Sequence, residues 1–251
     1  LQQSSAASDV YKRQIIIQSN FKIYNTINFK LHILRCIINV PMMIFGFAAL
    51  TYIPLEQIKA IGFLSPILVV ILSVIFLGER IYLIRTFSLI LGLIGTLIIL
   101  RPGFIEINIG VYMVLASALL WSCVIIITKF MSKNDSAMTI LTFQYTFVTL
   151  FTLPLAIIYW NNPSFISLIY TLLAAIVGTV LHLCINNAYK LSDLSIIQPV
   201  WFTQLVFASF LGFIIFGSLP DFFTWIGAIL VFISVLIITY STNFSTNNIV
   251  Q

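Results

Sequence analysis

The chain has 251 residues, of which 61% are hydrophobic and 8% are charged, and its formal net charge is +5. A soluble domain carries roughly 25% charged residues, so this composition excludes an ordinary water-soluble domain. The basic residues stand singly and form no patch with interleaved aromatic residues, which argues against a nucleic-acid partner.

Residues 1–14 read LQQSSAASDVYKRQ and differ in character from everything that follows. The segment is polar, has no initiating Met, and lacks the apolar region and cleavage site of a signal peptide. It resembles the translated sequencing-adapter tails at the ends of metagenomic reading frames. We interpret it as a non-native tail, with a native disordered tail as the alternative, and expect the natural chain to begin upstream.

Long stretches without Asp, Glu, Lys or Arg dominate the remainder of the chain. A helix needs roughly 20 apolar residues to cross a bilayer. The uncharged stretch 136–189 is too long for one crossing and breaks at Asn161-Asn162-Pro163-Ser164. After a mixed segment at 15–32, expected to be a loop with the stub of an earlier span, the predicted spans are 33–53, 57–78, 82–100, 110–129, 138–160, 165–189, 194–217 and 221–240.

These spans are continuously apolar, whereas the strands of a membrane barrel alternate between apolar and polar residues. In hydrocarbon only helices and closed barrels pair all their backbone groups. The predicted fold class is therefore an all-α, polytopic membrane bundle with about eight transmembrane helices. A polar tail, 241–251, follows the last span and is expected to be disordered.

The placement of lysine and arginine predicts the orientation, because cytoplasmic loops are enriched in both. With the loop before the first span in the cytoplasm, only Lys59 and Arg101 fall outside. The residues that fall inside are Lys22, Lys30, Arg35, Arg80, Arg85, Lys129, Lys133 and Lys190. The C-terminus is then predicted to be cytoplasmic.

An internal repeat relates 66–99 to 205–238 at an offset of 139 residues. Each copy has a long apolar helix that ends in Gly, a short polar turn, and a second helix with a small residue, Ser88 or Gly227, in its first half. In the predicted orientation the two turns lie on opposite sides of the membrane. Repeats of opposite topology are typical of secondary transporters.

Both halves of the chain contain short motifs in a fixed order. In the first half they are Ala49-Leu50-x-Tyr52-Ile53-Pro54, Ser65-Pro66, Leu77-Gly78-Glu79-Arg80, Gly95 and Arg101-Pro102-Gly103. In the second half they are Ala188-Tyr189-Lys190, Gln198-Pro199, Phe216-Gly217 and Trp225-Ile226-Gly227-Ala228. This ordered set resembles the EamA-type drug/metabolite transporter superfamily, and the resemblance covers about residues 31–240.

The resemblance implies ten helices in two inverted five-helix halves, with a cavity between the halves. This chain would hold helices three to ten, with the rest of the first half-repeat at 15–104 and the second half-repeat at 105–240. It departs from the family pattern at Ser88, where Gly is usual, and at Ser218, where Glu is frequent.

Polar and aromatic residues within the spans are candidates for a solute cavity, because burying polar groups in hydrocarbon is costly. The candidates are Ser65, Pro66, Trp121, Gln144, Tyr145, His182, Asn186, Gln198, Trp201 and Gln204. The alternative for each is a packing role, in which the side chain bonds to a neighbouring helix.

Spacing groups these candidates by helix face. His182 and Asn186 stand four residues apart and share a face, and Gln198, Trp201 and Gln204 share a broad face of the next span. We interpret the two faces as walls of a pocket for a polar or aromatic solute.

Three further features complete the candidate site. Trp121 lies mid-span, away from the interfacial belt, and could stack on an aromatic solute. Ser65-Pro66 is expected to kink or break its helix towards the cavity. Glu79 and Arg80 are interpreted as an interfacial ion pair, with a cytoplasmic gate or a register lock as the functional alternative.

No Asp or Glu lies mid-span, so proton coupling would have to use His182 or residues upstream, and a facilitator stays open. The three cysteines have unrelated spacings and the chain has two histidines, so we expect no metal and no cofactor.

The leading hypothesis is a carrier of small organic metabolites in the cytoplasmic (inner) membrane, working by alternating access, and not an enzyme. Its expected partners are the lipid bilayer and a small-molecule solute, with a homodimer left open. The alternatives are efflux of drugs or toxic amphipaths, a membrane scaffold, and an intramembrane enzyme, which would need a carboxylate pair or a histidine pair.

Overall fold

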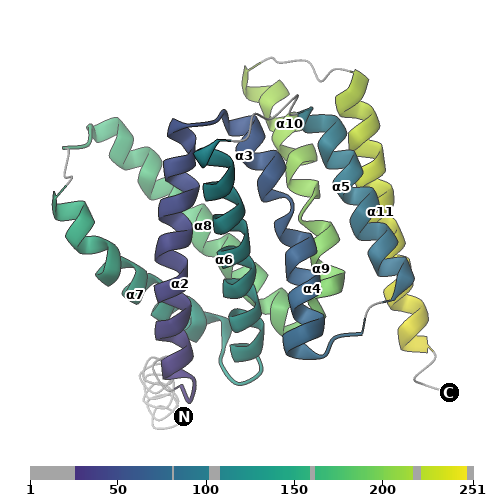
Figure 1. Cartoon of the computed structure of the whole chain (residues 1–251), viewed down its shortest axis with the longest axis horizontal. Coiled ribbons are helices and arrows are strands. Elements are labelled where there is room, and N and C mark those ends of the chain that lie inside the picture. The colour runs from purple at the N-terminus through teal and green to yellow at the C-terminus, as the bar shows by residue number, and fades with distance from the viewer. Residues whose placement is uncertain (1–25, 81, 102–107, 159–161, 217–221, 248–251) are drawn as a thin grey trace, which may run out of the picture. The chain divides into compact units, whose positions relative to one another are not determined.

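The computed structural model describes residues 26–80, 82–101, 108–158, 162–216 and 222–247, and every regular element in these ranges is helical (Figure 1). In chain order the helices are α2 (Phe29–Ala48), η1 (Ala49–Thr51), α3 (Leu55–Gly62), α4 (Ser65–Leu77), α5 (Leu83–Leu100), α6 (Ile109–Met131), α7 (Ala137–Ile158), α8 (Phe165–Leu191), α9 (Leu194–Val200), α10 (Thr203–Phe216) and α11 (Phe222–Asn247).

Eight segments of the described chain are long and apolar enough to cross a membrane, which confirms the predicted number of spans. Two boundaries differ from the prediction. The first span begins at Phe29, so part of the segment expected to be a loop is helical. The last helix continues to Asn247, so most of the tail expected to be disordered is helical as well. The polar turn at 218–221 lies outside the described residues.

Two of the spans are broken into pairs of short helices. The backbone leaves the helix at Phe63 and Leu64, between α3 and α4, and again at Trp201 and Phe202, between α9 and α10. Pro66 stands in the first turn of α4, where a missing N–H costs nothing, while Ser65 Oγ donates a hydrogen bond to the Gly62 carbonyl oxygen at 2.6 Å. The break expected at Ser65-Pro66 is therefore present.

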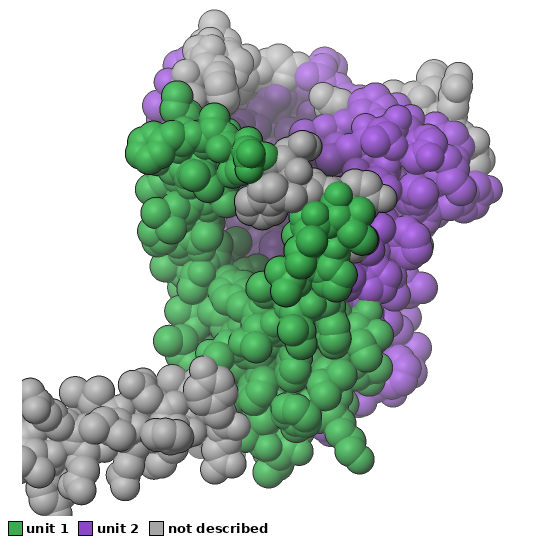
Figure 2. Space-filling view, turned by 90° about the vertical axis from the view of Figure 1, so that its left-hand side faces the viewer, with its two compact units in different colours: residues 1–37, 131–190 green, residues 38–130, 191–251 purple. Residues whose placement is uncertain are grey.

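The chain divides into two compact units, coloured separately in Figure 2. Unit 1 contains residues 1–37 and 131–190, and unit 2 contains residues 38–130 and 191–251. Each unit takes segments from both predicted half-repeats, so the units are not the halves. The division at 104/105 stays a prediction about the sequence repeat.

Within unit 1, aromatic rings join the first turn of α2 to α7. The Phe29 ring packs edge-on against Phe143 and Phe147 at centroid distances of 6.0 and 5.9 Å. The His32 ring stacks on Phe143 at 4.6 Å. Aromatic pairs in these geometries add to the stability gained by burial alone.

Within unit 2, α5 and α11 run side by side (Figure 1). They approach each other closely at Gly95 and Gly227, where a Cβ on Gly95 would lie 2.8 Å from the Gly227 carbonyl oxygen. Two turns away, Ser88 Oγ donates to the Ser234 carbonyl oxygen at 2.6 Å, and Ser234 Oγ donates to the Ser88 carbonyl oxygen at 2.8 Å. Ser88 is thus accommodated where the family pattern has Gly.

These contacts agree with the internal repeat. At the offset of 139 residues, Ser88 corresponds to Gly227 and Gly95 corresponds to Ser234. Exchanging the two copies therefore converts one contact pair into the other. The same exchange relates Phe63 to Phe202, and these two buried rings pack against each other at 5.7 Å in the core of unit 2.

Candidate functional site

Unit 2 contains a cavity of about 230 Å³ that six of the predicted site residues line. They are Ser65, Pro66, Trp121, Gln198, Trp201 and Gln204. All of the described residues that line this cavity belong to unit 2. The cavity is slightly smaller than the roughly 300–1,000 Å³ of pockets for drug-sized ligands, so it suits a small metabolite.

The two helix breaks meet at this cavity. Ser65 and Pro66 begin α4 directly after one break, Gln198 lies in the last turn of α9, and Trp201 stands in the other break. Discontinuous helices form the solute sites of many secondary transporters, because unwound backbone can be tolerated where it lines a cavity. α6 completes the wall with Ser117 and Trp121.

Two of the lining polar side chains are occupied by bonds within the protein. Ser65 Oγ donates to the Gly62 carbonyl oxygen, and Ser117 Oγ donates to the Met42 carbonyl oxygen at 2.9 Å. Gln198 differs from both. Its side chain is 1% exposed, and within the described part of the chain its Nε2 has no hydrogen-bond partner.

The remaining four predicted site residues lie in unit 1. Gln144 Oε1 accepts a hydrogen bond from Arg35 Nη2 at 2.6 Å, which gives Gln144 a structural role. The Tyr145 ring packs edge-on to His182 at 6.5 Å, and Asn186 on the next turn of α8 is buried. The sequence predicted one pocket formed by two residues of α8, His182 and Asn186, and by three residues of the following span. The cavity in unit 2 is lined by Gln198, Trp201 and Gln204 of that span, and α8 is not among its described lining elements.

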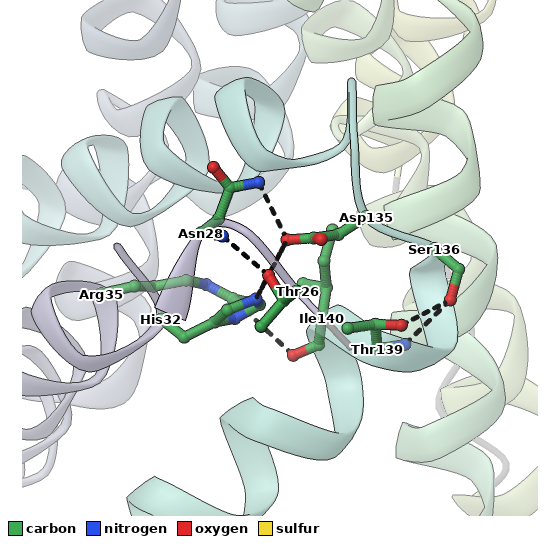
Figure 3. Close-up of polar contacts among 8 residues, drawn as sticks. All are labelled: Thr26, Asn28, His32, Arg35, Asp135, Ser136, Thr139 and Ile140. Atoms are coloured by element: carbon green, nitrogen blue, oxygen red, sulfur yellow. Dashed lines mark hydrogen bonds and ion pairs between the residues drawn. The ribbon is translucent and has the colours of Figure 1, made fainter. Parts of the chain in front are cut away.

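A buried polar cluster in unit 1 was missed by the sequence analysis (Figure 3). Asp135 Oδ2 accepts hydrogen bonds from Thr26 Oγ1 at 2.9 Å and Asn28 Nδ2 at 3.1 Å, and it lies 3.1 Å from His32 Nε2. His32 and Asp135 are 0% and 3% exposed. Both lie just outside the predicted spans, where polar residues are common, so no signal in the sequence singled them out.

Glu79 joins the end of α4 to the start of α9. Its carboxylate accepts hydrogen bonds from the backbone N–H groups of Leu194, at 3.0 Å, and Ser195, at 3.3 Å. The nearby ion pair is formed by Arg85, whose Nη1 lies 3.0 Å from Asp193 Oδ2. The expected ion pair between Glu79 and Arg80 is absent from the described residues, and the contacts of Glu79 are those of a register lock.

Comparison with known proteins decides the family. The EamA-like transporter family matches residues 14–101 and 108–240. The chain belongs to the EamA-like transporter family. As a family member it is a multi-pass membrane transporter and not an enzyme.

Several relatives of this EamA-like protein have named activities. A riboflavin transporter of Vibrio cholerae is 30% identical over 85% of this chain and 72% of its own length. An S-adenosylmethionine uptake transporter of Rickettsia prowazekii is 25% identical over 86% of this chain and 74% of its own length. One solved crystal structure shares the fold, with a TM-score of 0.73 and 18% identity over 86% of this chain and 78% of that chain.

Proposed function

We propose that this EamA-like protein is a secondary transporter that moves small organic metabolites across the cytoplasmic membrane, with the cavity in unit 2 as its solute site. The observation that carries the proposal is the meeting of two repeat-equivalent helix breaks in one cavity. A site at such a meeting point can be opened to either side by exchanging the conformations of two inverted repeats.

The chemistry of the cavity favours a solute with a ring. Trp121 and Trp201 provide two indole side chains, and Gln198 and Gln204 provide amides. Indole faces stack on planar rings, and amides fix the orientation of polar substituents. The relatives named for riboflavin and for S-adenosylmethionine carry ring-bearing metabolites of this kind.

Transport into liposomes that contain the full-length protein tests this proposal. We expect uptake of riboflavin or another ring-bearing metabolite in a broad panel, and we expect Trp201→Ala to reduce it at least several-fold. Trp225→Ala is the matched control, because Trp225 lies on α11, is 61% exposed and does not line the cavity. Equal transport by both variants, or no transport of any solute by the parent protein, would contradict the proposal.

The names of the relatives favour uptake over efflux as the direction of transport. Uptake is favoured by the relatives named as uptake transporters, while a more distant one, at 24% identity, is named as the pseudopaline exporter of Pseudomonas aeruginosa. Deleting the gene separates the two directions, because loss of uptake produces an auxotrophy and loss of efflux produces sensitivity to a toxic solute.

The proposed orientation follows from the placement of the basic residues. We place the C-terminus in the cytoplasm, and a C-terminal green fluorescent protein fusion should therefore fluoresce.

Association of two copies is also proposed, to be tested by light scattering in detergent. No nucleic-acid partner is proposed, because the basic residues form no patch.

A further inference from the structure

Among the described residues, two glycines line the cavity in unit 2, and their surroundings differ. A Cβ on Gly46 would lie 3.2 Å from Ser117 Oγ, so a side chain there would crowd the neighbouring helix. A Cβ on Gly62 would meet no heavy atom of the described chain within 4 Å. Close packing therefore accounts for Gly46 but not for Gly62.

The backbone does not require glycine at residue 62 either. Gly62 is the last residue of α3, and its φ lies outside the left-handed region that favours glycine. Glycine in a helix costs up to about 1 kcal/mol relative to alanine, so the position gives up helix stability. What this residue provides is the space that a side chain would fill.

That space belongs to the cavity. Ile58 and Lys59, one turn before Gly62 on α3, line the same cavity, so this face of the helix is turned towards it. An apolar cavity of roughly 150 Å³ holds one benzene ring. The cavity of unit 2, at about 230 Å³, is larger, so it has room for more than one ring. A leucine side chain at residue 62 would take up most of the surplus.

The internal repeat pairs Gly62 with Trp201. At the offset of 139 residues, Gly62 corresponds to Trp201 and Ser65 corresponds to Gln204, and all four line the cavity. In both pairs the second copy has the larger side chain. Since inverted repeats give each position of the fold twice, this difference belongs to the sequence of this chain. The second copy supplies an indole and an amide, and the first copy supplies room.

We infer that the cavity takes planar solutes with two or more fused rings, and that Gly62 is the residue that determines their size. One ring of the solute stacks on the indole of Trp201, and a further ring occupies the space that Gly62 leaves open. This inference rests on the proposed function, since it assigns a solute class and a specificity-determining residue to the same cavity.

Two pyrimidinediones test the inference, because uracil is a single ring and lumazine contains that ring fused to another. Their affinities for the purified full-length protein are measured by equilibrium dialysis in detergent. We expect lumazine to bind about tenfold or more tightly than uracil. Gly62→Leu should weaken lumazine by about tenfold or more and leave uracil within about twofold, and Gly62→Ala should weaken lumazine less than Gly62→Leu does.

Two further variants separate the effect of space from other effects. Gly178→Leu is the matched control, because a Cβ on Gly178 also meets no described atom within 4 Å, but Gly178 lies on α8 and does not line the cavity. It should leave both affinities unchanged. Trp201→Ala should weaken uracil and lumazine alike, because each of them stacks on the indole.

Three outcomes would overturn the inference. An equal loss of both compounds in Gly62→Leu would show that Gly62 serves the helix break as a flexible joint, and unchanged binding of lumazine would show that its space is not used. A parent protein that transports other solutes but does not bind lumazine would remove the solute class alone. Failure of the proposed function looks different, because the parent protein in liposomes would then transport no solute.

Discussion

Glu79 shows how one carboxylate can hold two turns of a membrane protein together. It accepts hydrogen bonds from the first two backbone N–H groups of α9, which Asp193 at the N-cap does not satisfy with its own side chain. Negative charge at a helix N-terminus is favourable because the unpaired N–H groups carry partial positive charge. The contribution of Glu79 is therefore to stability and to the relative position of α4 and α9.

We predict that Glu79→Gln lowers the stability of the protein by about 1 kcal/mol, the usual value of a helix cap. For a chain of this size that corresponds to a fall in Tm of roughly 2–4 °C, to be measured in detergent. Arg80→Gln is the control, because Arg80 is exposed and its neighbour makes the contacts to α9. An equal fall in Tm in both variants would show that the hydrogen bonds between Glu79 and α9 do not stabilise the protein.

The pair formed by His32 and Asp135 is the second prediction at this scale. A double-mutant cycle with His32→Ala and Asp135→Ala should give a coupling energy on the order of 1 kcal/mol in the free energy of unfolding, because the two side chains touch and share a buried network. Additive effects of the two substitutions would mean that Thr26 and Asn28 alone hold the carboxylate.

At the scale of helices, the seam between α5 and α11 depends on the absence of side chains. A Cβ on Gly227 would lie 2.5 Å from the Gly95 carbonyl oxygen, and backbone cannot move aside as the end of a flexible side chain can. Close approach of backbones at small residues is a general means of packing helices in membranes.

Gly227→Ala should therefore cost about 1–3 kcal/mol of stability, the usual range for an overpacked contact, measured by unfolding in detergent. Gly178→Ala is the matched control. Gly178 lies in α8, and a Cβ there would meet nothing within 4 Å. Because alanine has a higher helix propensity than glycine, this substitution should raise stability by up to about 1 kcal/mol. A neutral result at Gly227 would show that the two helices can separate without cost.

The elements differ in how far the sequence predicted them. The spans could be predicted because each contains a long uncharged stretch, and the break before Pro66 could be predicted because proline lacks an N–H. Pro199, two residues before the break at Trp201, also lacks an N–H and loosens the helix beside Gln198. The contacts of Glu79 could not be predicted, since they join segments more than 100 residues apart.

At the scale of the molecule, six of the ten cavity candidates line one cavity, and their role in transport stays a prediction. The aromatic and amide residues of the cavity stood out because polar groups are rare within spans. Which of them share a cavity depends on tertiary packing, so Gln144, paired with Arg35, could not be told apart from Gln198. Lys59 was interpreted as an orienting charge, and that it also lines the cavity is visible only in the structure.

The reciprocal pairing of Ser88 with Ser234 and of Gly95 with Gly227 has a consequence for motion. Exchanging the two repeats maps the glycine pair onto the serine pair, so the two ends of the seam are equivalent places that different residues fill. Inverted repeats that exchange conformations open a carrier to one side and then to the other. We therefore expect the α5–α11 seam to keep its contacts through the transport cycle, while the broken helices move relative to it.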